Sequence, residues 1–335
     1  MEGEEPRWSG VAKDGIPALT NPAFVTAVST EAAYLSADDR VMGLWWDGEW
    51  VAVPLNILRY HEIVNLDGAK GRIAVTYCPL TGTGIVWDRE AIGGAELGVS
   101  GLLWRNNLVM YDRSGEESLW RQMTGAAECG EATGTQLQER SVTEMTWEAW
   151  RGLHPNTRVV SSETDFVIEY DINLYATYER PDSPPLFEVT RDPRRQPKER
   201  VLGIPTDAGG TAIPFGVLHS VPLAAIHLEP MIDGVSTRVV VFWDREKQAA
   251  EAYYADPDWV GDSTPEGAET TFSVVEGRIV DDVTGSRWRI DGLATEGPAG
   301  ATQLREVQGS MVAFWFAWAA FNENTGVLEA LGGSS

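Results

Sequence analysis

The stretch R-V-M-G-L-W-W-D-G-E-W-V-A-V-P-L-N-I-L-R-Y-H-E-I-V-N, residues 40–65, decides the local fold. Two apolar runs flank Asp47-Gly48, a dipeptide typical of a two-residue β-hairpin turn. The apolar residues that follow have helical spacing and predict a helix over residues 56–65, with Asn56 as its N-cap. A hairpin followed directly by a short helix is therefore the expected starting unit of the fold.

The next stretch, G-R-I-A-V-T-Y-C-P-L-T-G-T at residues 71–83, predicts a strand over 72–78 that ends in a turn. Helical spacing of acidic and aromatic residues predicts another helix over 143–151, capped by Thr143. Residues 165–199 are rich in Tyr, Pro and Arg and lack a regular pattern, so they are expected to form an irregular connector.

The second half of the chain repeats the first. Matching segments follow in the same order in both halves: V-M-G-L at 41–44 and V-L-G-I at 201–204, I-V-W-D-R-E at 85–90 and V-F-W-D-R-E at 241–246, and W-E-A-W-R-G-L at 147–153 and W-F-A-W-A-A-F at 315–321. The order predicts an internal duplication. Four parts are expected: an N-terminal arm with a short helix (1–39), a first repeat that carries the site (40–164), the connector (165–199) and a structural second repeat (200–330).

Reactive side chains are concentrated in the first repeat. The chain has four histidines and two cysteines, and the second repeat contains no cysteine. Val221 and Pro222 occupy the positions that correspond to His61 and Glu62. Because the framework is shared and the reactive groups are not, the first repeat is the expected place for chemistry.

Composition excludes several classes of partner. Lys and Arg total 26 against 50 Asp and Glu, a net charge of −24, so nucleic acid and anionic membrane surfaces would be repelled. Two cysteines in 335 residues do not make a disulfide scaffold. The start lacks a basic and apolar leader, and the apolar run 311–321 is shorter than the roughly 20 residues that span a bilayer. We expect a cytoplasmic protein.

Several longer sequence motifs are similar to those of a known family. They are K-D-G-I-P-A-L from Lys13, R-Y-H-E-I-V-N from Arg59, T-Y-C-P-L-T-G-T from Thr76, G-V-S-G-L-L-W-R-N-N-L-V-M-Y-D-R from Gly98, S-L-W-R-Q-M-T-G from Ser118 and A-F-W-F-A-W-A-A-F from Ala313. Over nearly its whole length the chain resembles the domain of unknown function 3179 family, a resemblance that implies no established activity.

The chain departs from the family pattern at three points. Relatives usually read C-P-L-C-G-T, whereas Thr81 replaces the second cysteine here. Relatives often have His-Pro where this chain has Asn322 and Glu323, and many look exported. The paired thiols of relatives resemble a metal-binding or redox element. This chain keeps one of the two thiols, Cys78.

His61, Glu62 and Cys78 are the predicted catalytic residues. A histidine beside a thiol can lower the pKa of the thiol, and a histidine or a carboxylate can act as a general acid or base. His61 and Cys78 would also suit copper, zinc or iron, although no C-x-x-C or H-x-x-x-H spacing supports a metal and no cofactor is favoured. Successive helical residues diverge by about 100°, so His61 and Glu62 cannot both face one point.

We expect a β-rich α+β protein with two similar halves, rolled or barrel-like sheets and short peripheral helices. The favoured function is an enzyme of specialised metabolism, a cyclase or isomerase that acts on a small apolar molecule. A Cys-dependent hydrolase or transferase, a metal-binding or redox protein and a non-catalytic small-molecule binding protein remain alternatives. Further residues are predicted to line a Trp- and Tyr-walled pocket: Arg59, Asn65, Tyr77, Thr81, Trp104 and Tyr111.

Overall fold

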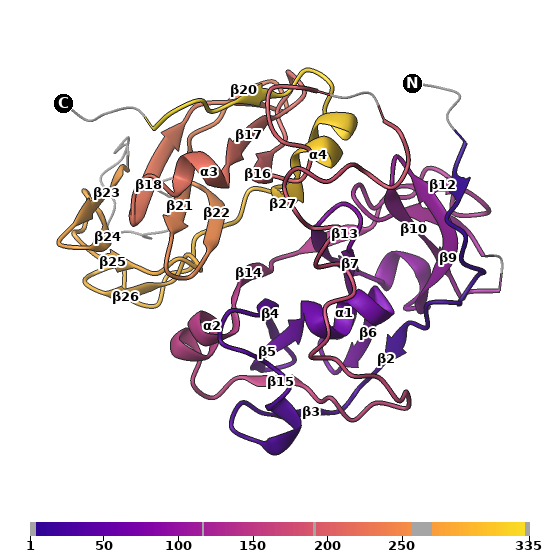
Figure 1. Cartoon of the computed structure of the whole chain (residues 1–335). Helices are drawn as coiled ribbons and strands as arrows, with labels where there is room; N and C mark the ends of the chain where they lie inside the picture. The colour runs from indigo at the N-terminus through magenta and orange to yellow at the C-terminus, as the bar shows by residue number, and fades with distance from the viewer. Residues whose placement is uncertain (1–4, 116, 190–191, 256–269, 332–335) are drawn as a thin grey trace. The chain divides into compact units, whose positions relative to one another are not determined.

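The computed structural model describes residues 5–115, 117–189, 192–255 and 270–331 (Figure 1). The chain forms two compact units. Unit 1 contains the chain up to Lys198 together with Ala313–Phe321, and unit 2 contains Glu199–Val312 and the chain from Asn322 onward. One segment of the predicted second repeat thus belongs to unit 1.

Unit 1 is built from three antiparallel or mixed sheets in its described residues. The first joins β1 (Arg7–Trp8), β9 (Leu97–Trp104), β10 (Asn107–Asp112), β11 (Leu119–Arg121) and β12 (Ala127–Cys129). The second joins β13 (Gln138–Arg140), β8 (Thr83–Asp88), β7 (Gly71–Cys78), β6 (Ile63–Gly68) and β2 (Leu19–Thr20). The third joins β14 (Thr143–Thr146), β4 (Arg40–Trp46), β5 (Glu49–Pro54), β15 (Arg158–Val160) and β3 (Phe24–Thr26).

Short helices connect these strands. They are α1 (Leu55–His61), α2 (Trp147–Leu153), α4 (Trp315–Phe321) and the 3-10 turns η1 (Thr30–Ala32) and η2 (Glu90–Ile92). No helix in the described ranges is long and apolar enough to cross a membrane. Residues 165–199 contain neither helix nor strand where the structure describes them.

Unit 2 also consists mainly of short strands. Its strands are β16 (Arg200–Ile204), β17 (Thr211–Pro214), β18 (Leu223–Leu228), β19 (Met231–Ile232), β20 (Val235–Ser236), β21 (Val239–Asp244), β22 (Ala249–Tyr254), β23 (Phe272–Val275), β24 (Arg278–Asp281), β25 (Arg287–Trp288), β26 (Ala294–Glu296) and β28 (Gly326–Val327), with helix α3 (Phe215–Leu218) after β17. Strand β27 (Met311–Phe314) leads out of unit 2 into α4.

Two structural details of unit 1 recur in unit 2. Strand β15 pairs parallel with β5, as β28 does with β17. The indole of Trp120 donates to Asp112 at 2.8 Å, and the indole of Trp288 donates to Asp281 at 2.9 Å. A parallel strand pair and an indole–carboxylate bond thus occur in both units.

The β-rich class is confirmed, since strands make up 40% and helices 10% of the structure. The hairpin at Asp47-Gly48 is confirmed as well, with β4 and β5 paired in register from Val41↔Pro54 to Trp46↔Glu49. Within the described residues the sheets remain open and none closes into a barrel.

The predicted helix over 56–65 is shorter than expected. It begins at Leu55, after Pro54, and ends at His61, because Glu62 adopts a left-handed conformation with φ of 56°. Ile63 and Val64 belong to β6, where they pair with β7. Asn56 does not cap the helix. Its amide instead donates to Asp39 at 3.1 Å and to the Tyr170 carbonyl at 3.0 Å.

The helix predicted over 143–151 starts later than expected. Thr143–Thr146 forms β14, which pairs with β4, so tertiary pairing overrides the helical spacing. The cap is Thr146, whose hydroxyl accepts from the Ala149 amide at 3.4 Å, and not Thr143.

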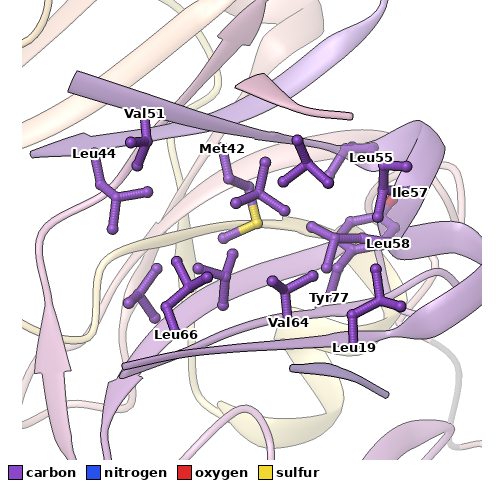
Figure 2. Packing of buried hydrophobic residues seen from close by; sticks show 14 of the residues in the cluster. Leu19, Met42, Leu44, Val51, Leu55, Ile57, Leu58, Val64, Leu66 and Tyr77 are labelled. Carbon is purple, nitrogen blue, oxygen red and sulfur yellow. The ribbon is translucent and has the colours of Figure 1, made fainter. Parts of the chain in front are cut away.

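A buried apolar cluster fixes α1 against the sheets. Figure 2 shows side chains from β4, β5, α1, β6 and β7 gathered in one layer, among them Met42, Leu58, Val64 and Tyr77. Each of these four is at most 1% exposed. Since burial of an apolar side chain contributes about 1.5–3 kcal/mol, this layer holds the C-terminal end of α1, and with it His61 and Glu62, in place.

Candidate functional site

Glu62 ends α1 and is the most unusual residue of the region. Its backbone amide donates to Leu58 and its carbonyl accepts from the Tyr77 amide, both at 2.8 Å. The residue is only 6% exposed, and no described residue forms a hydrogen bond or ion pair with its carboxyl group. Burial alone raises the pKa of Glu62 to about 8. The carboxyl group of Glu62 therefore ionises close to neutral pH.

Cys78 closes β7 and is fully buried. Its sulfur lies 3.7 Å from the Asn106 carbonyl, to which the S–H group can donate. Burial and then the charge of Glu62 raise the pKa of Cys78 to about 11, against hydrogen bonds from the Thr81 hydroxyl and from the amides of Thr81 and Leu108. At neutral pH the group is a thiol close enough to Glu62 for the two charges to interact.

Two connector tyrosines complete this neighbourhood, and the sequence did not single them out. Burial raises the pKa of Tyr175, and the charges of Glu62 and Cys78 raise it further, so its hydroxyl stays neutral. Tyr178 donates its hydroxyl proton to the Leu80 carbonyl at 2.9 Å. The only sequence signal was the density of Tyr in the connector, which carries no spacing that would point to Glu62.

Arg59 does not neutralise Glu62. Its guanidinium binds Glu179 of the connector through Nε at 3.1 Å and a second nitrogen at 3.3 Å. Asn173 donates to the same carboxylate at 3.0 Å. The Arg59–Glu179 pair thus fastens the connector to α1 beside Glu62.

His61 faces away from this neighbourhood. One ring nitrogen, Nδ1, lies 2.7 Å from the Pro17 carbonyl, and Nε2 lies 2.6 Å from the Tyr170 hydroxyl, which also contacts Thr164 at 2.8 Å. Because a carbonyl only accepts, Nδ1 donates, and neutral Nε2 accepts from Tyr170. Burial lowers the pKa of His61 against the Pro17 bond, which favours the neutral ring.

His61 and Cys78, the two metal ligands that the sequence offered, have different hydrogen-bond partners in the structure. Both nitrogens of His61 have protein partners, whereas Cys78 interacts with Glu62. Among the residues that the structure describes, no three His, Cys, Asp or Glu side chains gather in a way that could hold a metal ion. Both cysteines are free thiols, Cys78 buried and Cys129 exposed.

Thr81 lies in a buried polar network behind Cys78. Its hydroxyl contacts Thr83 at 2.9 Å and the Asn107 amide at 3.0 Å. The Asn107 amide also donates to Gln122 at 2.7 Å, and Gln122 donates to Thr76 at 3.1 Å. Asn107 and Gln122 were missed from the sequence, because they stand beside other polar residues, Arg105-Asn106 and Arg121, and match no site motif. The network fixes the orientation of the turn that follows Cys78.

Phe314, the last residue of β27, contacts the same turn. The Phe314 amide donates to the Thr81 carbonyl at 2.8 Å. Gly82 has a φ of 65°, and a Cβ there would come within 2.9 Å of the Phe314 ring. The glycine is thus required both by its backbone conformation and by the close approach of this ring.

The remaining pocket predictions lie in separate surroundings. Asn65 bridges two sheets through paired 2.9 Å bonds to the backbone of Leu97. Tyr77 belongs to the core cluster. The Trp104 ring lies under the Arg121 guanidinium, 3.7 Å from its centroid, and the Tyr111 hydroxyl donates to Asp14. The structure brings Glu62, Cys78 and Thr81 together, and it gives Asn65, Trp104 and Tyr111 local partners of their own.

Comparison with known proteins identifies the family. The model of a family described as a protein of unknown function (DUF3179) matches residues 13–325, so the chain belongs to that family. Neither the curated proteins nor the solved structures contain a significant match to the chain. Because the family description names no activity, function has to be inferred from the residues themselves.

Proposed function

We propose that the chain is an enzyme that rearranges a small, largely apolar molecule by general acid–base catalysis, in the manner of an isomerase or cyclase. Glu62 is the proton-transferring group. The observation that carries the proposal is the carboxyl group of this residue, which is only 6% exposed as a whole; in the described residues the carboxyl group has no hydrogen-bond or ion-pair partner.

A carboxyl group with a purely structural role would have partners. Burial of a polar group without a hydrogen bond costs about 1–3 kcal/mol in proteins, and a buried charge costs more. Glu62 also adopts a left-handed backbone conformation, with φ of 56°, which costs a non-glycine residue about 1–2 kcal/mol. Such unfavourable features are concentrated at functional sites, where chemistry requires them.

The pKa of Glu62 suits proton transfer. General acid–base catalysis is most efficient when the pKa of the group lies near the working pH, and the pKa of Glu62 is about 8. The carboxylate would remove a proton from one position of the substrate and return it at another. Tyr175, held neutral by burial and by its acidic neighbours, can donate a hydrogen bond to a substrate oxygen.

Because such a reaction moves atoms within one molecule, its product has the mass of its substrate. The test incubates the purified protein with the apolar metabolite fraction of cells that encode it and follows compounds that change retention time at constant mass. Wild type and Glu148→Gln, an α2 control whose side chain is 69% exposed, should convert the same compound. Glu62→Gln should lose about 10²-fold in rate. Equal conversion by Glu62→Gln would overturn the proposal.

A further inference from the structure

The connector carries a concentration of exposed apolar side chains. Within residues 166–174, four such side chains are between 38% and 108% exposed: Phe166, Val167, Ile172 and Leu174. Single exposed apolar residues are ordinary on a protein surface, but a group of them rimmed by polar residues marks an interaction site. Neither the proposed proton transfer nor the core cluster of unit 1 includes these four side chains.

The same stretch is fixed to unit 1 by the residues between the exposed ones. Tyr170 is only 2% exposed, and Ile168 packs against the core cluster. The Tyr60 hydroxyl, near the end of α1, lies 3.3 Å from the Glu169 carbonyl and 3.0 Å from the Ile172 carbonyl. A surface that is already ordered loses little further conformational entropy when a partner binds to it.

The exposed apolar side chains on both sides of Tyr170 lie over the same end of α1. The centroid of the Phe166 ring lies 5.2 Å from that of the His61 ring. The backbone of residues 169–172 is bonded to Tyr60, which directly precedes His61 in the helix. The fold therefore brings the two apolar pairs, 166–167 and 172 with 174, to one surface.

The charged residues of this stretch are all acidic. No Lys or Arg occurs in residues 159–179. Four of the acidic residues are exposed, and within the described part of the chain their carboxylates form no hydrogen bond or ion pair: Glu163, Asp165, Glu169 and Asp171. We call these four residues and the four exposed apolar ones the connector patch.

We infer that the connector patch docks a basic, amphipathic segment of a partner protein, in which Lys or Arg side chains flank apolar ones. The apolar side chains of that segment would cover those of the connector patch, and its cations would pair with the surrounding carboxylates. The contact removes apolar surface from water and supplies the carboxylates with the partners that unit 1 does not give them. This inference goes beyond the proposed catalysis and does not depend on it.

Charge argues against the other occupants of such a surface. In a symmetric dimer a second copy would place the acidic patch against itself, and the chain has a net charge of −24. Nucleic acids and anionic lipid headgroups carry negative phosphates, which the patch would repel. The complementary partner is therefore both cationic and apolar, a combination that a basic amphipathic polypeptide provides.

A synthetic helical peptide of Lys and Leu, about 14 residues long and labelled with fluorescein, serves as the probe. Fluorescence anisotropy measures its affinity for the full chain in about 0.15 M salt. A second peptide, with every Leu replaced by Ser, has the same charge and reports attraction by the net charge alone. We expect the chain to bind the Leu–Lys peptide at least about tenfold more tightly than the Ser–Lys peptide.

A pair of apolar variants locates the binding surface. Val167→Ser with Leu174→Ser should weaken binding of the Leu–Lys peptide about tenfold, and the fold should tolerate both changes because both side chains are exposed. Val235→Ser with Val275→Ser, a control pair of exposed residues in unit 2, should change the affinity less than about twofold. Equal effects of the two pairs, or equal affinity of the wild-type chain for both peptides, would overturn the inference.

A pair of charge variants tests the carboxylates. Glu169→Gln with Asp171→Asn should weaken binding of the Leu–Lys peptide more than the control Glu131→Gln with Glu148→Gln, which removes the same charge from exposed positions elsewhere. Equal weakening by both would mean that net charge alone attracts the peptide and would contradict the inference. Sedimentation supplies a further check: a wild-type dimer that the apolar double variant of the connector converts to a monomer would identify a second copy as the occupant and would also overturn it.

Discussion

Replacement of Glu62 by Gln should stabilise the protein above pH 5, and increasingly so up to pH 8. The pKa of Glu62 is raised from 4.5 to about 8 in the folded state. Between these values the folded chain holds a proton that the unfolded chain has lost, so wild-type stability falls as the pH rises. Gln has the same shape and does not titrate, and the left-handed backbone at position 62 is common to both proteins.

The magnitude follows from the shift in pKa. A shift of about 3.5 units, at 1.36 kcal/mol per unit, gives a difference on the order of 5 kcal/mol above pH 8 and about 3 kcal/mol at pH 7. Below about pH 3.5, where Glu62 is protonated in both the folded and the unfolded state, wild type and Glu62→Gln should have nearly equal stability.

Urea unfolding of wild type, Glu62→Gln and the exposed control Glu148→Gln at pH 5, 6, 7, 8 and 9 provides the measurement. The difference between Glu62→Gln and wild type should grow by roughly 1.4 kcal/mol per pH unit and level off above pH 8. Glu148→Gln should follow wild type at every pH. A Glu62→Gln protein that is less stable than wild type at pH 8, or a difference that does not change with pH, would refute the reasoning.

Three other substitutions test the surroundings of the site. Arg59→Met should destabilise the protein by about 3 kcal/mol, because it leaves the Glu179 carboxylate, 17% exposed, without its guanidinium; Arg59→Met with Glu179→Met should recover much of this in urea unfolding. His61→Phe should lower the unfolding free energy by about 2 kcal/mol near neutral pH, through loss of two hydrogen bonds, and should remove the loss of stability below about pH 6.5 that follows from the lowered pKa of His61. Lys198→Met removes three bonds from Nζ to the connector, at 2.6–2.8 Å, and should speed proteolysis within residues 165–189; an unchanged cleavage rate would contradict that role.

Local signals in the sequence predicted local structure. The turn at Asp47-Gly48 needs only its own residues and the apolar runs beside it, and it forms as expected. The end of α1 could not be predicted in this way. Ile63 and Val64 fit a helical period as well as a strand, and their pairing with β7 decides between the two. Thr143 has the same ambiguity, resolved by pairing of β14 with β4.

The candidate site, too, could be predicted from the sequence only in part. Comparison of the two halves drew attention to Glu62 and Cys78, since the second half lacks both. The sequence could not show that Glu62 would lack a partner, because Arg59, three residues before it, could have paired with it. The path of the connector decides both contacts. It places Glu179 where it pairs with Arg59, and it places Tyr175 where the charge of Glu62 raises the pKa of the tyrosine. Contacts between such distant positions leave no periodic or motif signal.

The ionisation of Glu62 is the most direct test of the account. Infrared difference spectra between wild type and Glu62→Gln, recorded from pH 5 to pH 10, isolate the carbonyl band of this one protonated carboxyl group. The account predicts a band that is present at neutral pH and is lost with a midpoint near pH 8. A Glu62 carboxyl that is already ionised at pH 6 would contradict it.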